Sequence, residues 1–187
     1  VHAYASNNET KDMLIDKTVT RMSEMLSWFD TMDLPVLLTL ELNRGKQSIV
    51  DPGTTCQGML EIHKKVAHPK FGICWDFGHF YVNVLNKLTA PSPPTDFLSL
   101  VTHTHIHDIG PTGQTHWPLT ENRLPLVKYV RQLLKAGYSG IWNLEFSLER
   151  FADSGTVCER VLTSVSLLAE TLETQFPPMW VAGELTS

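Results

Sequence analysis

The chain has 187 residues, of which 42% are hydrophobic and 19% are charged, and its formal net charge at pH 7 is −5. This composition is that of a globular protein, and we expect residues 1–187 to form one domain. No apolar run approaches the ~20 residues of a membrane span, so no membrane partner is expected. The acidic balance argues against a nucleic-acid partner, because binding of phosphate groups normally requires a basic surface.

The three cysteines, Cys56, Cys74 and Cys158, are odd in number and widely spaced. They do not form the pattern of a disulfide-rich secreted protein. The first residues also lack the basic and apolar regions of a signal peptide. We therefore expect a reducing compartment, most simply the cytoplasm.

Taken in chain order, the sequence predicts strands that alternate with helices. A strand at residues 1–5 is followed by a helix at 10–32, whose apolar positions recur at helical spacing. Apolar strands are predicted at 34–42, 71–76, 98–107 and 139–146, and helices at 55–67, 78–88, 124–136 and 155–174. Residues 89–95 and 109–119 are predicted loops, and 175–187 an irregular tail. Such alternation is typical of a parallel sheet covered by helices.

Four of these strands carry a metal-binding side chain near their carboxyl ends: Glu41, Asp76, His105 and Glu145. Roughly 30 to 40 residues separate each from the next, enough for a helix and a return to a parallel strand. Because parallel strands end at the same edge of a sheet, the four side chains are expected to converge. Three carboxylates and one imidazole suit Mn²⁺, Mg²⁺ or Co²⁺, and Zn²⁺ is also compatible. The sequence thus predicts a divalent-metal site.

Several longer motifs occur in the order found in one enzyme superfamily. They are Leu40-Glu41-Leu42-Asn43, Cys74-Trp75-Asp76-Phe77-Gly78-His79, His103-Thr104-His105-Ile106-His107-Asp108, His116-Trp117-Pro118-Leu119, and Gly137-Tyr138-Ser139-Gly140 leading to Leu144-Glu145. At these residues the chain resembles the xylose-isomerase-like TIM barrels, the sugar phosphate isomerase/epimerase group. The resemblance implies an α/β fold, a partial (β/α)8 barrel of about five parallel β/α units that correspond to family strands 4–8. The earlier units would be missing, so either the chain is truncated or another chain completes the barrel. The chain alone is expected to form an open curved sheet.

The resemblance also implies a role for each candidate residue. The metal ligands would be Glu41, Asp76, His105 and Glu145. The substrate contacts would be His79 beside the metal, and His107, Asp108 and His116 at the mouth of the pocket.

Such a metal can bind the carbonyl and neighbouring hydroxyl of a sugar and stabilise the charge that develops when the adjacent carbon loses its proton. Glu41 and Glu145 would be the catalytic pair, one removing the proton and the other returning it from the opposite face. The predicted function is therefore a metal-dependent sugar or sugar phosphate isomerase or epimerase in carbohydrate metabolism. Its partner would be a small-molecule sugar, and a homo-oligomer is compatible with the missing strands.

Other functions stay open. A dehydratase (lyase) would use the same metal and base but expel a hydroxyl group. The endonuclease IV branch hydrolyses phosphodiesters with a multi-zinc cluster and an Asp-x-His pair, but here the corresponding residues are Gln114-Thr115-His116. A non-catalytic partial barrel, or a subunit active only when assembled, would account for the missing strands. The substrate is open too, because Pro111 stands where sugar epimerases often carry an arginine.

Overall fold

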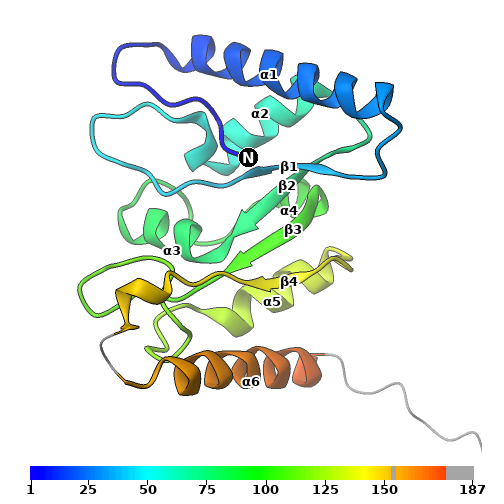
Figure 1. The fold of residues 1–187 in the computed structure, drawn as a ribbon. Coiled ribbons are helices and arrows are strands. Elements are labelled where there is room, and N and C mark those ends of the chain that lie inside the picture. Colours follow the sequence, from blue (N-terminus) through cyan, green and yellow to red (C-terminus); the bar gives the residue numbers. More distant parts are fainter. Residues whose placement is uncertain (153–154, 176–187) are drawn as a thin grey trace, which may run out of the picture.

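The computed structural model describes residues 1–152 and 155–175, which form a four-stranded parallel sheet covered by helices (Figure 1). The strands lie side by side in chain order as β1 (Leu38–Glu41), β2 (Phe71–Asp76), β3 (Val101–Ile106) and β4 (Trp142–Leu144). The helices are α1 (Lys11–Thr31), α2 (Cys56–Val66), α3 (Phe77–Leu85), α4 (Thr95–Ser99), α5 (Leu126–Lys135) and α6 (Val157–Gln175). The predicted alternation and parallel sheet are confirmed. All but the first residue of the predicted tail lies outside the described residues.

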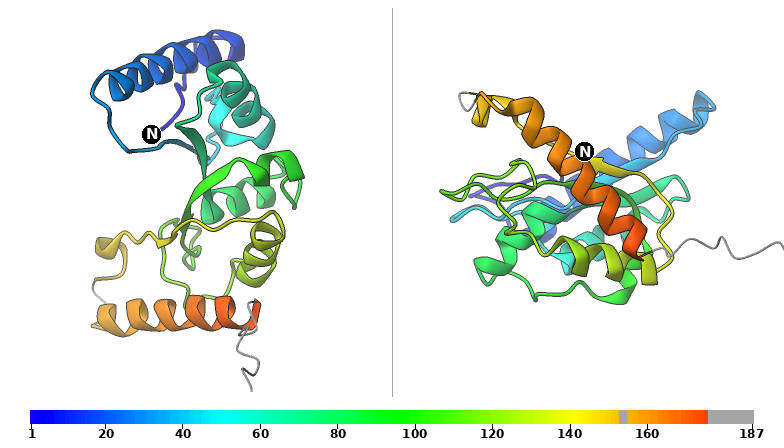
Figure 2. Two further views of the ribbon diagram at one scale, coloured as in Figure 1. Left: turned by 90° about the vertical axis from the view of Figure 1, so that its right-hand side faces the viewer. Right: turned by 90° about the horizontal axis from the view of Figure 1, so that it is seen from below.

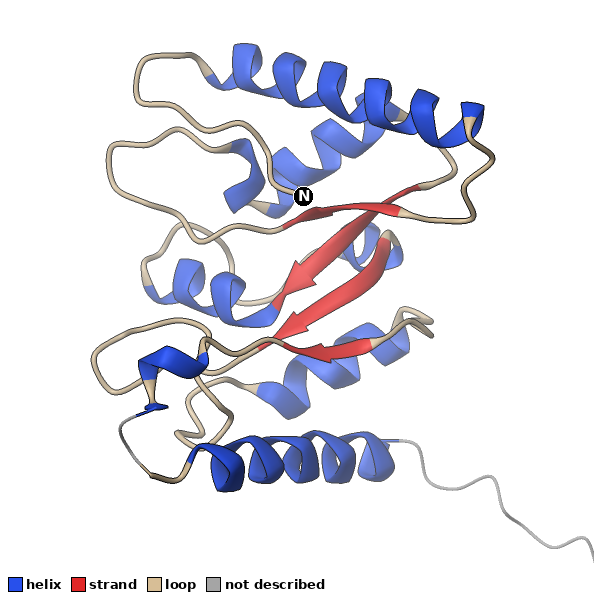
Figure 3. Cartoon of the chain, in the orientation of Figure 1, coloured by secondary structure: helices blue, strands red, loops and turns tan. Residues whose placement is uncertain are grey.

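The sheet forms part of a barrel wall. In the left view of Figure 2, α2 to α5 lie on one side of the sheet, and α1 and α6 lie at its two ends. No α-helix of the described residues covers the other side, where only the short 3-10 helix Leu148–Arg150 lies in the segment after β4 (Figure 3). Because a complete (β/α)8 barrel closes eight strands, this arrangement is an open partial barrel. No helix in residues 1–152 or 155–175 is long and apolar enough to cross a membrane.

Side-chain caps fix where the helices begin. Thr10 accepts a hydrogen bond from the backbone N–H of Met13 at the start of α1, at 3.3 Å. Asp76 does the same at α3, where it accepts from the N–H of His79 at 2.7 Å. Such caps satisfy N–H groups that have no partner within the helix. In α3 the cap is also a predicted metal ligand, so one side chain sets both the helix start and the candidate site.

The helix-facing side of the sheet is an aromatic core. Trp75 of β2 is fully buried, and its ring centroid lies 4.4 Å from that of Phe77 and 5.2 Å from that of Tyr129. Phe80 and Phe97 approach the same indole edge-on, at 5.6 and 6.2 Å. Tilted and edge-on packing is favoured by the ring quadrupoles. This cluster anchors β2, and with it Asp76, against the helices.

The predicted strand at residues 1–5 is wrong, so the sheet has four strands and not five among the described residues. The amino group of Val1 donates to the carbonyl of Thr39, and the N–H of Glu41 donates to the carbonyl of Val1. Beyond Val1 the chain leaves the sheet edge, and the N–H of Tyr4 donates to Thr18 of α1 at 3.0 Å. The ladder with β1 is therefore not continued.

Three other predicted strands are longer than those observed. The strand predicted at 98–107 begins at Val101, because residues 95–99 form α4, whose Phe97 and Leu98 are buried. A helix of five residues is too short to show a helical period in the sequence. The strands predicted at 34–42 and 139–146 are shortened where Leu37 and Ile141 are 58% and 69% exposed. An apolar run alone thus overestimates strand length at the edges of this sheet.

Candidate metal centre

The four predicted metal ligands come together at the carboxyl end of the sheet. One ligand atom from each of Glu41, Asp76, His105 and Glu145 lies within 4.8 Å of every other. Strand register produces this approach: Asp76 is level with His105, and Glu41 is level with Cys74, two residues before Asp76. Glu145 follows β4, where its N–H donates to the carbonyl of Ile106 at 3.0 Å. The topology therefore gathers residues from four strands into one cluster.

Two ligand atoms of this cluster are buried and form an ion pair, but they make no hydrogen bond of good geometry. Nδ1 of His105 lies 3.0 Å from Oε2 of Glu145 and 3.5 Å from Oε2 of Glu41. Neither this nitrogen nor Oε2 of Glu145 makes a hydrogen bond within the described parts of the chain. Buried polar atoms without partners are rare, and a bound ion is one reason for them. With three carboxylates and one imidazole, the residues fit a hard divalent cation.

The electrostatics of the cluster also favour a cation. Burial acts to lower the pKa of His105, but the neighbouring Cys74, Glu145 and Glu41 outweigh it and raise the pKa to about 12. The adjacent His105 ring in turn holds the pKa of Glu145 below its usual range. Without a metal, the carboxylates thus retain a proton on His105. A metal would compete with that proton, because a ligating imidazole must be neutral.

Asp76 is oriented by two histidines. Its Oδ1 accepts from the N–H of His79 and lies 3.0 Å from Nε2 of His107. Nδ1 of His107 lies 2.9 Å from the backbone nitrogen of His116 and 3.0 Å from the carbonyl oxygen of Asp108, so the backbone holds the far side of the ring. Burial acts to raise the pKa of Asp76, but His107 and His79 outweigh it and lower the pKa. A carboxylate kept ionised and held by a histidine is well placed to bind a metal.

Gly78 permits the close contact between α3 and His107. A Cβ atom at position 78 would lie 2.0 Å from Cε1 of His107. The His107 ring is fully buried and has no room to retreat. The glycine of the Asp-x-Gly-His motif is therefore a steric requirement for the support of Asp76.

The four predicted substrate contacts divide into two pairs. His79 and His116 line a cavity of about 510 Å³ beside the metal ligands. Nδ1 of His79 lies 3.6 Å from Oε1 of Glu41, and Nε2 of His116 lies 3.7 Å from Oε2 of Glu145. His107 and Asp108 are fully buried, and Asp108 accepts hydrogen bonds from the backbone N–H groups of Ile109, Arg123 and Leu124. The structure thus buries the second pair, whose contacts are with Asp76 and with backbone groups.

Comparison with known proteins decides the family. Residues 1–164 match the family described as xylose isomerase-like TIM barrel. The chain belongs to this family. The resemblance carried by the motifs is thereby confirmed. No curated protein matches the sequence.

Solved structures share the fold of this xylose isomerase-like chain. The zinc-bound IolI protein matches with a TM-score of 0.69 at 16% identity, over 94% of this chain and 62% of its own. A D-tagatose 3-epimerase-like protein matches with a TM-score of 0.62 at 19% identity, over 87% and 55%. The 3-keto-D-glucoside 4-epimerase YcjR from E. coli matches with a TM-score of 0.61 at 15% identity, over 88% of this chain and 57% of its own. At these identities the likeness establishes the fold, and the chain spans between 55% and 62% of these structures.

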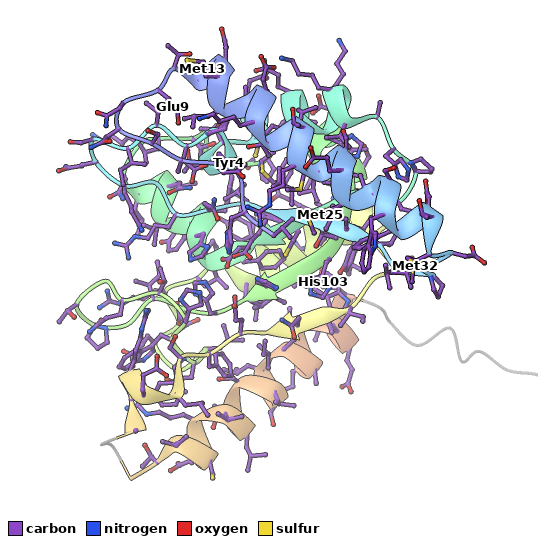
Figure 4. The ribbon with its side chains drawn as sticks, turned by 45° about the horizontal axis from the view of Figure 1, so that its top comes forward. Tyr4, Glu9, Met13, Met25, Met32 and His103 are labelled. Carbon is purple, nitrogen blue, oxygen red and sulfur yellow. The ribbon has the colours of Figure 1, made fainter. Side chains whose placement is uncertain are left out.

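The xylose isomerase-like chain also gathers Cys74, His103 and His2, which are not among the predicted site residues, near the predicted ligands. Cys74, His103 and His105 have ligand atoms within 4.8 Å of one another, and His103 on β3 is labelled in Figure 4. Nε2 of His2 lies 3.7 Å from Oε2 of Glu41, and His2 lines the cavity. Alternation along β3 indicates that His103 shares a face with His105. No sequence signal indicates His2, because its place depends on Val1 lying against β1.

Proposed function

We propose that this chain acts as a divalent-metal-dependent sugar isomerase or epimerase, which transfers a proton at the carbon next to a carbonyl. The observation that carries the proposal is the approach of Glu41, Asp76, His105 and Glu145, which each place one ligand atom within 4.8 Å of the others. The family and the epimerases among the similar structures support this reaction class. Mn²⁺, Mg²⁺ and Co²⁺ suit the donor set, and the zinc of IolI makes Zn²⁺ a further candidate.

The four residues would divide the work. Asp76 and His105 would hold the metal, which would supply positive charge beside the substrate carbonyl. Glu41 and Glu145 approach His105 from the two ends of the sheet, one from β1 and the other from the segment after β4. The Glu145 side chain is 38% exposed and that of Glu41 is 10% exposed. We therefore assign proton removal to Glu145, which is more accessible to substrate, and proton return to Glu41.

Metal binding and solvent exchange test the proposal together. The chain should bind one Mn²⁺ in titration calorimetry and should wash solvent deuterium into a ketose at the carbon beside the carbonyl. Glu145→Gln should abolish exchange, because an amide is not a base at neutral pH, and should weaken Mn²⁺ binding. Glu170→Gln, an exposed position on α6, is the matched control and should change neither. Equal exchange in Glu145→Gln and the control, or the absence of any metal binding, would contradict the proposal.

A second candidate is a phosphodiesterase like endonuclease IV. It is favoured by the group Asp76, His79, His107 and His116, whose ligand atoms also lie within 4.8 Å of one another and which shares Asp76 with the first cluster. Two adjacent cation positions would suit cleavage of a phosphodiester. Zinc-dependent cleavage of a duplex with an abasic site, without deuterium exchange into ketoses, would favour this candidate over the isomerase.

A further inference from the structure

The cavity beside the metal ligands is positively charged, although the chain as a whole has a net charge of −5. Its lining includes the cationic side chains of Arg44, Lys46 and Arg150 but one carboxylate, that of Asp51. Asp51 is turned toward its own loop, where it accepts from the N–H of Gly53 at 2.7 Å and from Asn43 at 3.0 Å. Within residues 1–152 and 155–175, the salt bridges of lysines and arginines involve other residues than these three cations. Their charges are thus not neutralised by carboxylates in contact.

The two arginines are held in place by backbone carbonyl groups. Nη1 of Arg44 donates to the carbonyl of Gly113 at 3.4 Å, and Nη1 of Arg150 donates to the carbonyl of Thr115. Both carbonyls belong to the loop that Asp108 and Trp117 close by a bridge. A guanidinium has five N–H donors, so these contacts leave donors available on each arginine. The ammonium of Lys46 makes no hydrogen bond within the described part of the chain.

The cations stand beside the candidate catalytic groups. Arg44 follows Glu41 in the loop after β1, and Arg150 follows Glu145 in the segment after β4. His79 and His116 line the cavity and also contact the two glutamates. The cavity that the cations line therefore adjoins the candidate metal ligands through these two histidines. Its volume of about 510 Å³ is within the range of small-molecule sites.

We propose that Arg44, Lys46 and Arg150 bind an oxyanion, a phosphate or carboxylate group, on the substrate of this site. The inference rests on the proposed function and narrows its substrate class to anionic sugars, such as sugar phosphates or sugar acids. Guanidinium groups match the geometry of both oxyanions and bind them through charge-assisted hydrogen bonds.

Titration of the metal-free chain with inorganic phosphate and, separately, with acetate tests the site without any need for activity. The expected result is saturable binding that weakens as salt is added. Arg44→Gln and Lys46→Gln should each weaken binding about tenfold. This factor is the lower end of the range expected for the loss of one charge-assisted hydrogen bond. Arg131→Gln, an exposed arginine on α5, should leave binding unchanged. The tighter of the two probes identifies the oxyanion.

Two variants distinguish the loss of positive charge from a change in the loop whose Gly113 carbonyl accepts from Arg44. Lys46→Gln breaks no hydrogen bond to the loop, so its effect reports charge alone. Arg44→Lys keeps the charge and should retain most of the binding that Arg44→Gln loses. Absence of saturable binding of either probe, or equal binding in Lys46→Gln and the Arg131→Gln control, would overturn the oxyanion site. A chain that exchanges deuterium into a neutral ketose but binds neither probe would keep the proposed function and refute this inference alone.

Discussion

Trp75 and Asp76 are neighbours in β2, and both are fully buried, but they lie on opposite faces of the sheet. The indole of Trp75 packs among aromatic rings on the helix-covered face. The carboxylate of Asp76 lies among histidines at the candidate metal centre. Equal burial therefore has opposite consequences. Burial of apolar surface stabilises the fold, whereas burial of a charged group costs free energy unless partners or an ion compensate it.

The two faces consequently divide stability and function between them. The aromatic face fixes β2 against α3 and α5 and does not depend on an ion. The polar face places carboxylates and imidazoles at distances of 3.0 to 3.7 Å, an arrangement that a divalent cation would stabilise by binding the folded state. Variants on the two faces should therefore respond differently to removal of metal.

The largest effect is expected on the aromatic face. Trp75→Ala should lower the free energy of unfolding by about 3–5 kcal/mol, because a large buried side chain is lost and a cavity remains. The loss should be the same with Mn²⁺ and with EDTA, as measured by urea unfolding. Trp28→Ala is the matched control: Trp28 is 57% exposed, and its removal should cost well under 1 kcal/mol. A metal-dependent loss in Trp75→Ala would show that the two faces are not independent.

The next effect is expected where the faces meet, at Gly78. Gly78→Ala should destabilise the chain by about 1–3 kcal/mol, since the added methyl overlaps the buried His107 ring. It should also weaken Mn²⁺ binding, because His107 orients Asp76. Urea unfolding of Gly78→Ala, His107→Ala and the double variant gives a cycle in which the double variant loses less than the sum of the singles. If the two losses of unfolding free energy simply add, the added methyl group does not overlap the His107 ring.

The convergence of four side chains could be predicted from the sequence, because each depends on a regular strand and on one topological rule. Parallel strands end at one edge of the sheet, so Glu41, Asp76, His105 and Glu145 converge independently of the conformation of the loops that follow them. Positions set by loops were not predictable in this way. The motif predicts Asp108 as a pocket residue. In the structure its carboxylate accepts hydrogen bonds from the backbone N–H groups of Ile109, Arg123 and Leu124. Lys46 lies in an irregular segment and Arg150 lies in a three-residue 3-10 helix, and neither carries a periodic signal.

The same reason accounts for the errors in the fold. Periodicity identified the long elements, including all six residues of β2. It failed for α4, which has one and a half turns, and for residues 1–5, where one pair of hydrogen bonds with β1 does not extend into a ladder. Short elements depend on tertiary contacts that a local pattern does not contain.

A smaller effect is expected from pH, with opposite signs for stability and for metal affinity. In the metal-free chain the pKa of His105 is raised above its ordinary value of 6.5, so the folded state holds a proton that the unfolded chain releases. This stabilisation is fully present below pH 6.5 and is lost as the pH rises toward the folded value. Metal affinity should instead increase with pH, because binding displaces that proton.

Urea unfolding with EDTA and Mn²⁺ titration, both between about pH 7 and pH 8.5, measure these two trends. The unfolding midpoint should fall and the affinity should rise over this range. His105→Asn should flatten both, whereas His68→Asn, outside the cluster, should flatten neither. Parallel trends for stability and affinity would show that His105 does not hold the proton.

The smallest effect is expected on the reactivity of the three cysteines, which differ in their surroundings. Cys56 lies in the apolar core, Cys74 lies on the polar face of β2, and Cys158 is exposed on α6. Burial raises the pKa of Cys56 to about 12 and also raises that of Cys74, so neither forms the reactive thiolate at neutral pH. A thiol reagent should therefore modify one cysteine in the native chain and three in denaturant, and Cys158→Ser should remove the native reaction.

Rapid modification of Cys74 but not Cys56 would show that the polar face opens locally while the aromatic face stays closed. Addition of Mn²⁺ should then slow Cys74 alone, because a cation on Asp76 and His105 would hold that face shut.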